Sequence, residues 1–552
     1  MSVMKKTRIA TSVTLVLTAS QVLAAAPDAG QTLQQLQQKP FDIPKTDELS
    51  IIVPALGSHV EPGGPKVKLN KIRITGNNSI TTEELEQAVL SVHLDQMHDF
   101  AGIRAIADEI SQYYRNAGYP FARAYIPQQS LGNGELAITL LEGQYGNVIT
   151  TGDIPLFSNQ AGAFLLKLKK GDAIRSESLE RATLLLSDQP GIQTSATMQP
   201  STTIGAGDLI VDIKRVNPVN ASLGIDNFGN RYTGENRLLA SVNLNNPYKL
   251  GHQINLNAIY TNQSMWFGGI GYQMPVTGDG LKANFSYSRT AYELGKEFSN
   301  LGAQGTADVL SVGLSYALIR SQKTNVGIGV SVQHKDLNDR LQVGTDTNNK
   351  SSNSLPLTIN FDHRDTLFGG GISFGTIAWT QGTLSLNDAL KKADTNNTNG
   401  DFGKLTLDLV RLQYLTDKAS LYVRASGQWS TKNLDSSEDF GIGGINAVRA
   451  YPVGEGYGDI GWFSQLELRY AINKDFMPYA FYDFGSSTLN KTTTIGGNKT
   501  TDISGAGIGL RYFKQNWKAE LTAAWRLSNN RPSDLNAADS TPILWGSVTY
   551  LY

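Results

Sequence analysis

The chain has 552 residues, a net charge of −1, 55 glycines, 19 prolines and no cysteine, and 40% of its residues are hydrophobic. A near-neutral chain lacks the excess of basic residues that is typical of nucleic-acid-binding proteins. No run of about 18 apolar residues follows the N-terminal segment, which excludes a helical membrane protein. Many glycines in a long chain of modest hydrophobicity favour numerous short strands over a helical core.

Residues 1–24 are predicted to be a secretory signal peptide. A basic stretch that ends at Arg8 precedes an apolar run from about Ile9 to Leu23, and small residues follow. We therefore expect cleavage after Ala24 or Ala25. An uncleaved membrane anchor is disfavoured, because the apolar run is short for a helix that spans hydrocarbon. The lack of cysteine also agrees with export through an oxidising compartment.

A short, polar helix is predicted over residues 28–38. Leu33 and Leu36 lie three residues apart, and glutamine occupies most of the other positions. A helix this polar cannot bury one face in an ordinary core, so it either lacks a fixed structure or docks in a polar cavity. Residues 39–65, which contain five prolines and little periodicity, are predicted to be a linker.

One order of elements, strand-helix-helix-strand-strand, occurs twice, in residues 66–143 and again in residues 144–217. Thr81 and Glu84 form a capping box at the start of the first helix. The expected strands are 67–75, 121–126, 135–141, 145–151, 193–199 and 208–216, and the expected helices are 81–91, 101–117, 160–168 and 178–186. Two copies of a small α/β unit without a catalytic cluster predict binding modules.

From residue 218 to the C-terminus, apolar and polar residues alternate almost without interruption. Trp517, Leu521 and Trp525, for example, alternate with Lys518 and Glu520. Such alternation lets one face of each strand meet lipid while the other meets water. Sixteen strands are expected, starting near residues 219, 236, 252, 265, 281, 308, 324, 355, 372, 404, 420, 460, 476, 503, 517 and 543.

The lengths of the connections between these strands also alternate. From the fifth strand onward, connections of about 15 to 30 residues follow odd-numbered strands, and connections of about 4 to 9 follow even-numbered ones. A soluble β-sandwich would not combine this asymmetry with an even strand count and a signal peptide. We therefore predict an all-β transmembrane barrel of 16 antiparallel strands over residues 218–552, monomeric and in the outer membrane. Its terminal aromatic residues, Tyr550 and Tyr552, resemble the signal that the barrel assembly machinery recognises.

Two short motifs lie near the C-terminal end of the barrel. A loop of about 30 residues, between Ser430 and Asp459, contains Val-Arg-Ala-Tyr at positions 448–451, and the thirteenth strand contains Phe-x-Asp-x-Gly at positions 481–485. Strand parity places Asp483 on the face expected to line the lumen. If the loop folds inward, Arg449 and Asp483 can pair with bidentate geometry. The alternative is a solvated arginine and an aspartate in a turn.

Taken together, these features resemble the two-partner secretion transporters, the TpsB family, which includes the haemolysin and filamentous-haemagglutinin secretion proteins. The repeated α/β units resemble the periplasmic POTRA domains of that superfamily. The family motifs read Val-Arg-Gly-Tyr and Phe-x-Asp-x-Gly, so the resemblance implies that Arg449 and Asp483 lock the loop inside the lumen. The supporting residues that it implies are Val448, Tyr451, Phe481 and Gly485.

One residue departs from the family motif, since Ala450 stands where the family has glycine. If that position needed a positive φ, alanine would cost on the order of 1 kcal/mol. Either its backbone conformation is ordinary or the loop tolerates strain.

The resemblance implies a pore that recognises a large exoprotein and passes it from the periplasm to the cell surface. The exoprotein would be an adhesin, a cytolysin or a contact-dependent toxin, and the helix at 28–38 would plug the resting pore. The other expected partners are outer-membrane lipid and, during biogenesis, the barrel assembly machinery. No nucleophile elbow, phosphate loop or zinc-protease motif is present, so no enzyme activity, cofactor or metal is expected. The alternative is a factor that inserts barrels into the membrane.

Overall fold

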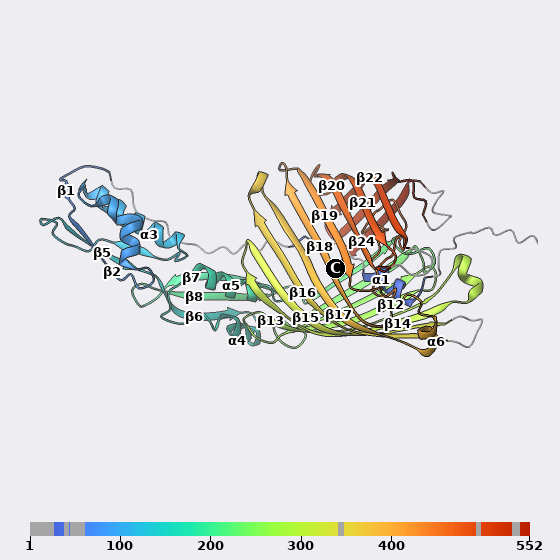
Figure 1. Ribbon diagram of the computed structural model, residues 1–552. Helices are drawn as coiled ribbons and strands as arrows, with labels where there is room; N and C mark the ends of the chain where they lie inside the picture. The colour runs from blue at the N-terminus through green and yellow to red at the C-terminus, as the bar shows by residue number, and fades with distance from the viewer. Residues whose placement is uncertain (1–26, 38–42, 45–60, 341–346, 493–497, 533–540) are drawn as a thin grey trace, which may run out of the picture.

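The computed structural model describes residues 27–37, 43–44, 61–340, 347–492, 498–532 and 541–552 (Figure 1). The predicted signal peptide and most of the predicted linker lie outside these residues. Within the described ranges, no helix is both long enough and apolar enough to span a membrane.

The first α/β unit is built on a three-stranded sheet with the order β2-β5-β4. Its elements are β1 (Val67–Lys68), β2 (Lys71–Thr75), α2 (Thr82–Leu85), a π turn (Glu86–Leu90), a 3-10 turn (Ser91–His93), β3 (Met97–His98), α3 (Phe100–Asn116), β4 (Arg123–Tyr125) and β5 (Glu135–Leu141). The Thr81 hydroxyl accepts a hydrogen bond from the N–H of Glu84, as the capping box predicts. The strand expected over 67–75 is broken, because β1 pairs with β3 instead of joining the sheet.

The second α/β unit repeats this topology, with the sheet order β6-β8-β7. Its elements are β6 (Gln144–Gly152), α4 (Pro155–Leu165), α5 (Ser176–Ser187), β7 (Ile192–Pro200) and β8 (Ala206–Arg215). In both three-stranded sheets one edge strand (β2 or β6) pairs in parallel with the central strand (β5 or β8). The other edge strand (β4 or β7) pairs antiparallel with that central strand. Two units of one topology are what the repeated element order predicts.

The rest of the chain forms a closed barrel of sixteen antiparallel strands, which confirms the predicted fold class. Its strands are β9 (Val219–Asp226), β10 (Arg237–Asn245), β11 (Gln253–Thr261), β12 (Trp266–Pro275), β13 (Leu281–Glu293), β14 (Gln304–Arg320), β15 (Thr324–Arg340), β16 (Thr347–Asp365), β17 (Gly371–Leu386), β18 (Gly400–Tyr414), β19 (Ala419–Ser430), β20 (Ile460–Tyr470), β21 (Phe476–Thr488), β22 (Thr500–Lys514), β23 (Trp517–Arg526) and β24 (Ile543–Leu551). Two 3-10 turns (Lys296–Leu301 and Leu367–Gly369) and helix α6 (Asp388–Ala393) lie in the connections.

The alternation of each strand separates the two faces of the wall. On β20, Leu468 and Tyr470 are 54% and 50% exposed. Glu467 and Arg469, which alternate with them along the strand, are 2% and 8% exposed. The exposed apolar face is suited to lipid and the opposite face lines the lumen.

Strand β16 is longer than expected at both ends. It begins at Thr347 rather than near Leu355, because its first residues are polar and the apolar alternation marks only the part that faces lipid. It ends at Asp365, and residues 362–365 belong to the strand, where they pair with β17 and in part with β15.

Both α/β units project from one end of the barrel, where the short turns lie (Figure 1). The guanidinium of Arg320, at the end of β14, donates to both carboxylate oxygens of Asp188, at 2.7 and 2.6 Å. Arg181 on α5 donates to the carbonyl of Asp279, in the turn between β12 and β13, and to the carbonyl of Ala317 on β14. These contacts fix the second unit against the barrel.

Candidate functional site

The connection between β19 and β20, residues 431–459, folds back into the barrel, and we call it the lumen loop. Its tip is a tight turn in which the N–H of Gly444 donates to the carbonyl of Tyr451, at 3.0 Å. Gly444 has a φ of 110°, a conformation that favours glycine over residues with a side chain. Apolar residues of the turn pack against aromatic residues of the wall, among them Phe463 and Phe481. The loop is therefore a packed element of the lumen.

The structure places Arg449 of the lumen loop against Asp483 of β21. Its Nε donates to Asp483 Oδ2 at 2.7 Å, its Nη2 donates to Asp483 Oδ1 at 2.6 Å, and its backbone N–H donates to Oδ2 at 3.1 Å. The two residues are 2% and 0% exposed. A bidentate pair fixes orientation as well as adding attraction, so this contact fixes the register of the loop on the wall.

The other motif residues surround this pair. The Arg449 guanidinium lies 3.6 Å from the centre of the Phe481 ring, within cation–π range. The hydroxyl of Tyr451 donates to the carbonyl of Asn530, which joins the lumen loop to the connection before β24. Val448 is fully buried, and Gly485 allows close approach of β20, because a Cβ there would lie 2.8 Å from the carbonyl oxygen of Trp462. All four supporting residues thus lie around the Arg449–Asp483 contact.

Sequence reasoning missed a second carboxylate, Glu467 of β20. Arg449 donates to it through Nη1, and Arg469 and Arg511 also pair with it, at 2.6 and 3.1 Å. Arg511 in turn pairs with Glu520 on β23. The resulting network joins three arginines to three carboxylates, so its charges balance within the lumen wall. The sequence signal was present, since alternation places Glu467 on the same face as Gln465 and Arg469.

Ala450 has an ordinary backbone conformation, because its φ is not positive. It is fully buried, and its methyl group occupies space left open by Gly505 on β22. A Cβ added at Gly505 would lie 2.2 Å from the Ala450 Cβ. The departure from the family glycine is therefore accommodated by a glycine on the facing strand.

Helix α1 (Ala29–Gln37) lies inside the barrel (Figure 1). Asp28 is its N-cap, accepting from the N–H of Gln31 at 2.9 Å, and the N–H of Ala29 donates to Asp339 on β15. Leu33 is 3% exposed and packs with a small apolar cluster on the wall, against which Leu36 also packs. The helix is thus docked in the lumen by polar contacts at its start and by one apolar stripe.

Two family models match this chain. The model described as haemolysin secretion/activation protein ShlB/FhaC/HecB matches residues 205–512. The chain belongs to the ShlB/FhaC/HecB family. A model of the ShlB-type POTRA domain also matches, at residues 67–143. The resemblance predicted from the motifs is confirmed.

Relatives and solved structures agree with this family. The heme/hemopexin transporter protein HuxB of Haemophilus influenzae is 25% identical over 546 residues, which cover 94% of this chain and 95% of HuxB. The outer membrane transporter CdiB of Dickeya dadantii is 23% identical over 84% of each chain. The structure of CdiB from Escherichia coli superposes with a TM-score of 0.74 at 18% identity, over 96% of this chain and 100% of that one. BamA from Haemophilus ducreyi, lacking POTRA domains 1–3, gives a TM-score of 0.52 at 13% identity, over 88% of this chain and 100% of that one.

Membership in the ShlB/FhaC/HecB family, with a closed barrel and a POTRA domain, places the chain in the bacterial outer membrane, with its α/β units in the periplasm. The C-terminal residues of this family member close the barrel. Tyr550, on β24, lies edge-on to the Trp517 ring, with ring centres 5.0 Å apart, and the N–H of Tyr552 donates to the carbonyl of Ala221 on β9. Whether these tyrosines are read by the assembly machinery stays a prediction.

Proposed function

We propose that this chain is the outer-membrane pore for one large exoprotein, which it recognises in the periplasm and releases at the cell surface. The observation that supports this most strongly is a sixteen-stranded barrel whose lumen is filled by a docked helix and a folded loop, with α/β units at its periplasmic mouth. A diffusion porin needs no such units. Relatives described as transporters of heme/hemopexin and of hemolysin fit the same role.

The two α/β units, residues 66–143 and 144–217, are the proposed receptor for the exoprotein's N-terminal secretion domain. Each sheet has open edges, and β7 is an edge strand that pairs with β8 on one side. An exposed edge strand can extend a client's own β-structure by strand addition. This kind of recognition depends on the backbone more than on the side chains. Folding of the client outside the cell is the proposed source of direction, and no catalysis is involved.

A cysteine at Ser195 on β7 is expected to crosslink to the secretion domain in the full-length chain. The chain has no cysteine of its own, so a thiol-to-amine reagent acts at that position alone. A cysteine at Glu177, exposed on helix α5, is the matched control and should give little product. Crosslinks confined to cysteines on the barrel would show that the α/β units are not the receptor.

Helix α1 is the proposed plug of the resting pore. A variant that lacks residues 28–40 is expected to show higher and less noisy conductance in planar bilayers, because its lumen loses an element that the wall and the loop both contact. Leu33→Ser, which weakens only the apolar contact of the helix, should raise the open probability by a smaller amount. Unchanged conductance in the deletion variant would exclude a plug.

A further inference from the structure

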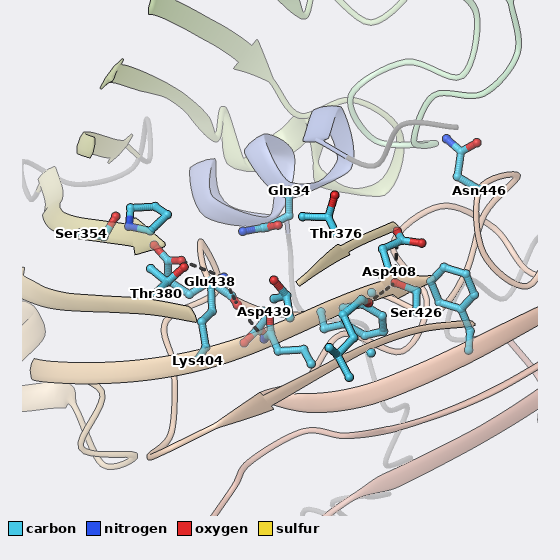
Figure 2. Close-up of a pocket in the computed structure, with 18 of the residues that line it drawn as sticks. Gln34, Ser354, Thr376, Thr380, Lys404, Asp408, Ser426, Glu438, Asp439 and Asn446 are labelled. Atoms are coloured by element: carbon cyan, nitrogen blue, oxygen red, sulfur yellow. Dashed lines mark hydrogen bonds and ion pairs between the residues drawn. The ribbon is translucent and has the colours of Figure 1, made fainter. Parts of the chain in front are cut away.

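A second buried charge cluster fixes the lumen loop to strands other than those that hold Arg449. Glu438, on the limb of the loop that runs from residue 435 to 439, pairs with Lys335 of β15 at 2.6 Å and with Lys404 of β18 at 2.9 Å. The side chains of the three residues are 3%, 5% and 12% exposed. Figure 2 shows Glu438 and Lys404 together below Gln34 of helix α1. We call these three residues the Glu438 cluster.

Further hydrogen bonds fix the same limb to the same side of the wall. Lys404 also donates to the backbone carbonyl of Glu438, at 3.0 Å, and so does the amide of Gln428 on β19, at 2.9 Å. Lys335 donates to the carbonyl of Ser437, at 3.3 Å. The limb is therefore fixed by β15, β18 and β19, whereas Arg449 is fixed by β20 and β21.

Helix α1 rests on this limb. The side-chain amide of Gln34 donates to the carbonyl of Ser437, and Gly30 packs so closely that an added Cβ would lie 2.5 Å from the backbone nitrogen of Ser437. Lys350 of β16 joins the two elements, since its ammonium lies 2.8 Å from Asp28 and 2.9 Å from Asp435. The position of the helix therefore depends on the position of the limb.

We propose that Glu438, Lys335 and Lys404 are positioning residues that hold the limb in place and thereby keep helix α1 in the lumen. This inference rests on the proposed plug and extends it, because it assigns two different roles to two sets of residues in the lumen loop. The Arg449–Asp483 pair fixes the tip of the loop, and the Glu438 cluster fixes the seat of the helix. A cavity of about 620 Å³, lined by Gln34, the Glu438 cluster and neighbouring wall residues, lies beside the limb and gives it room to move.

Neutralising Glu438 leaves two lysines without their shared carboxylate in a buried site, which strongly destabilises the arrangement. Movement of the limb into the cavity then removes the surface on which helix α1 packs. Substituting both lysines by methionine breaks the same contacts from the wall side and leaves one carboxylate without partners. The two changes should therefore have the same effect on the helix, although they alter opposite charges.

The test follows the helix directly, through a cysteine at Thr32 in the cysteine-free full-length chain. Thr32 is fully buried and close to cysteine in size, so Thr32→Cys should react slowly with a soluble maleimide in outer-membrane vesicles. Adding Glu438→Gln, or Lys335→Met together with Lys404→Met, is expected to raise the labelling rate about tenfold or more. Glu438→Asp, which keeps the charge, should stay near the reference rate.

Asp226→Asn is the matched control, because Asp226 pairs with Arg237 of the adjacent strand, at 2.7 and 2.8 Å, within the wall itself. It should leave the labelling rate unchanged. Unchanged labelling in both disrupted variants, with the barrel inserted, would overturn the inference, and so would an equal rise in Arg449→Ala. If labelling rises while removal of residues 28–40 leaves conductance unchanged, the Glu438 cluster seats the helix and only the plug proposal fails.

Discussion

Export of the exoprotein is expected to fall about tenfold or more in Arg449→Ala and in Asp483→Ala, with most of the barrel still inserted. Each change removes one partner of a bidentate pair in which both residues are almost fully buried. Either change leaves one unbalanced charge in the buried network of Arg449, Asp483 and Glu467, and the tip of the lumen loop loses its register. The lipid-facing side chains are untouched, so the effect should be local. The measurement is secreted exoprotein relative to barrel abundance in outer membranes.

The double variant Arg449→Ala/Asp483→Ala should be no worse than either single variant, as expected for groups that act as one unit. Arg449→Lys should also be impaired, because an ammonium keeps the charge but cannot reproduce the forked contact with Asp483 and Glu467. Normal export by both alanine variants, or fully additive losses, would show that the two residues do not lock the loop.

Gly505→Val is expected to reduce export as strongly as loss of Arg449, for a steric reason. A Cβ at position 505 would lie 2.2 Å from the Ala450 Cβ, and Ala450 is the neighbour of Arg449. The branched side chain therefore displaces the tip of the loop from β22. Gly505→Ala should have a smaller effect, measured again as secreted exoprotein relative to inserted barrel.

Ala450→Gly should partly restore export to Gly505→Ala, because it removes the nearest atom of the clash. Restoration should be incomplete, since a Cβ at 505 would still lie 2.9 Å from the carbonyl oxygen of Trp525. Equal export by Gly505→Val and the unaltered chain would show that the loop does not need to sit against β22.

The barrel could be predicted from sequence because its strands carry a local signal. A period of two marks each wall segment, so most strands begin where expected, and Trp517 and Ile543 are first residues of β23 and β24. The polar start of β16 carries no such signal, because a ladder with its neighbours extends it beyond the lipid-facing part. The break near Leu69 is likewise set by pairing with a distant segment, β3.

The candidate site could be predicted only where a family motif marks it. Arg449 and Asp483 were identified from two short motifs and strand parity. Glu438 lies in a loop without periodicity, and its partners come from two strands that are far apart in sequence, so no local pattern indicates the cluster. The composition of residues 28–38 predicts helix α1. Its position beside residues 435–439, however, depends on how the loop folds into the lumen.

Export of the proposed exoprotein partner tests the central claim most directly. Cells with and without the chain would be compared for exoprotein at the surface and in the medium, and for the abundance of unrelated outer-membrane barrels. A dedicated pore predicts that export stops without the chain, that the exoprotein is lost or retained in the periplasm, and that other barrels stay at normal levels. Normal export together with a general loss of barrels would contradict the account and favour an assembly factor.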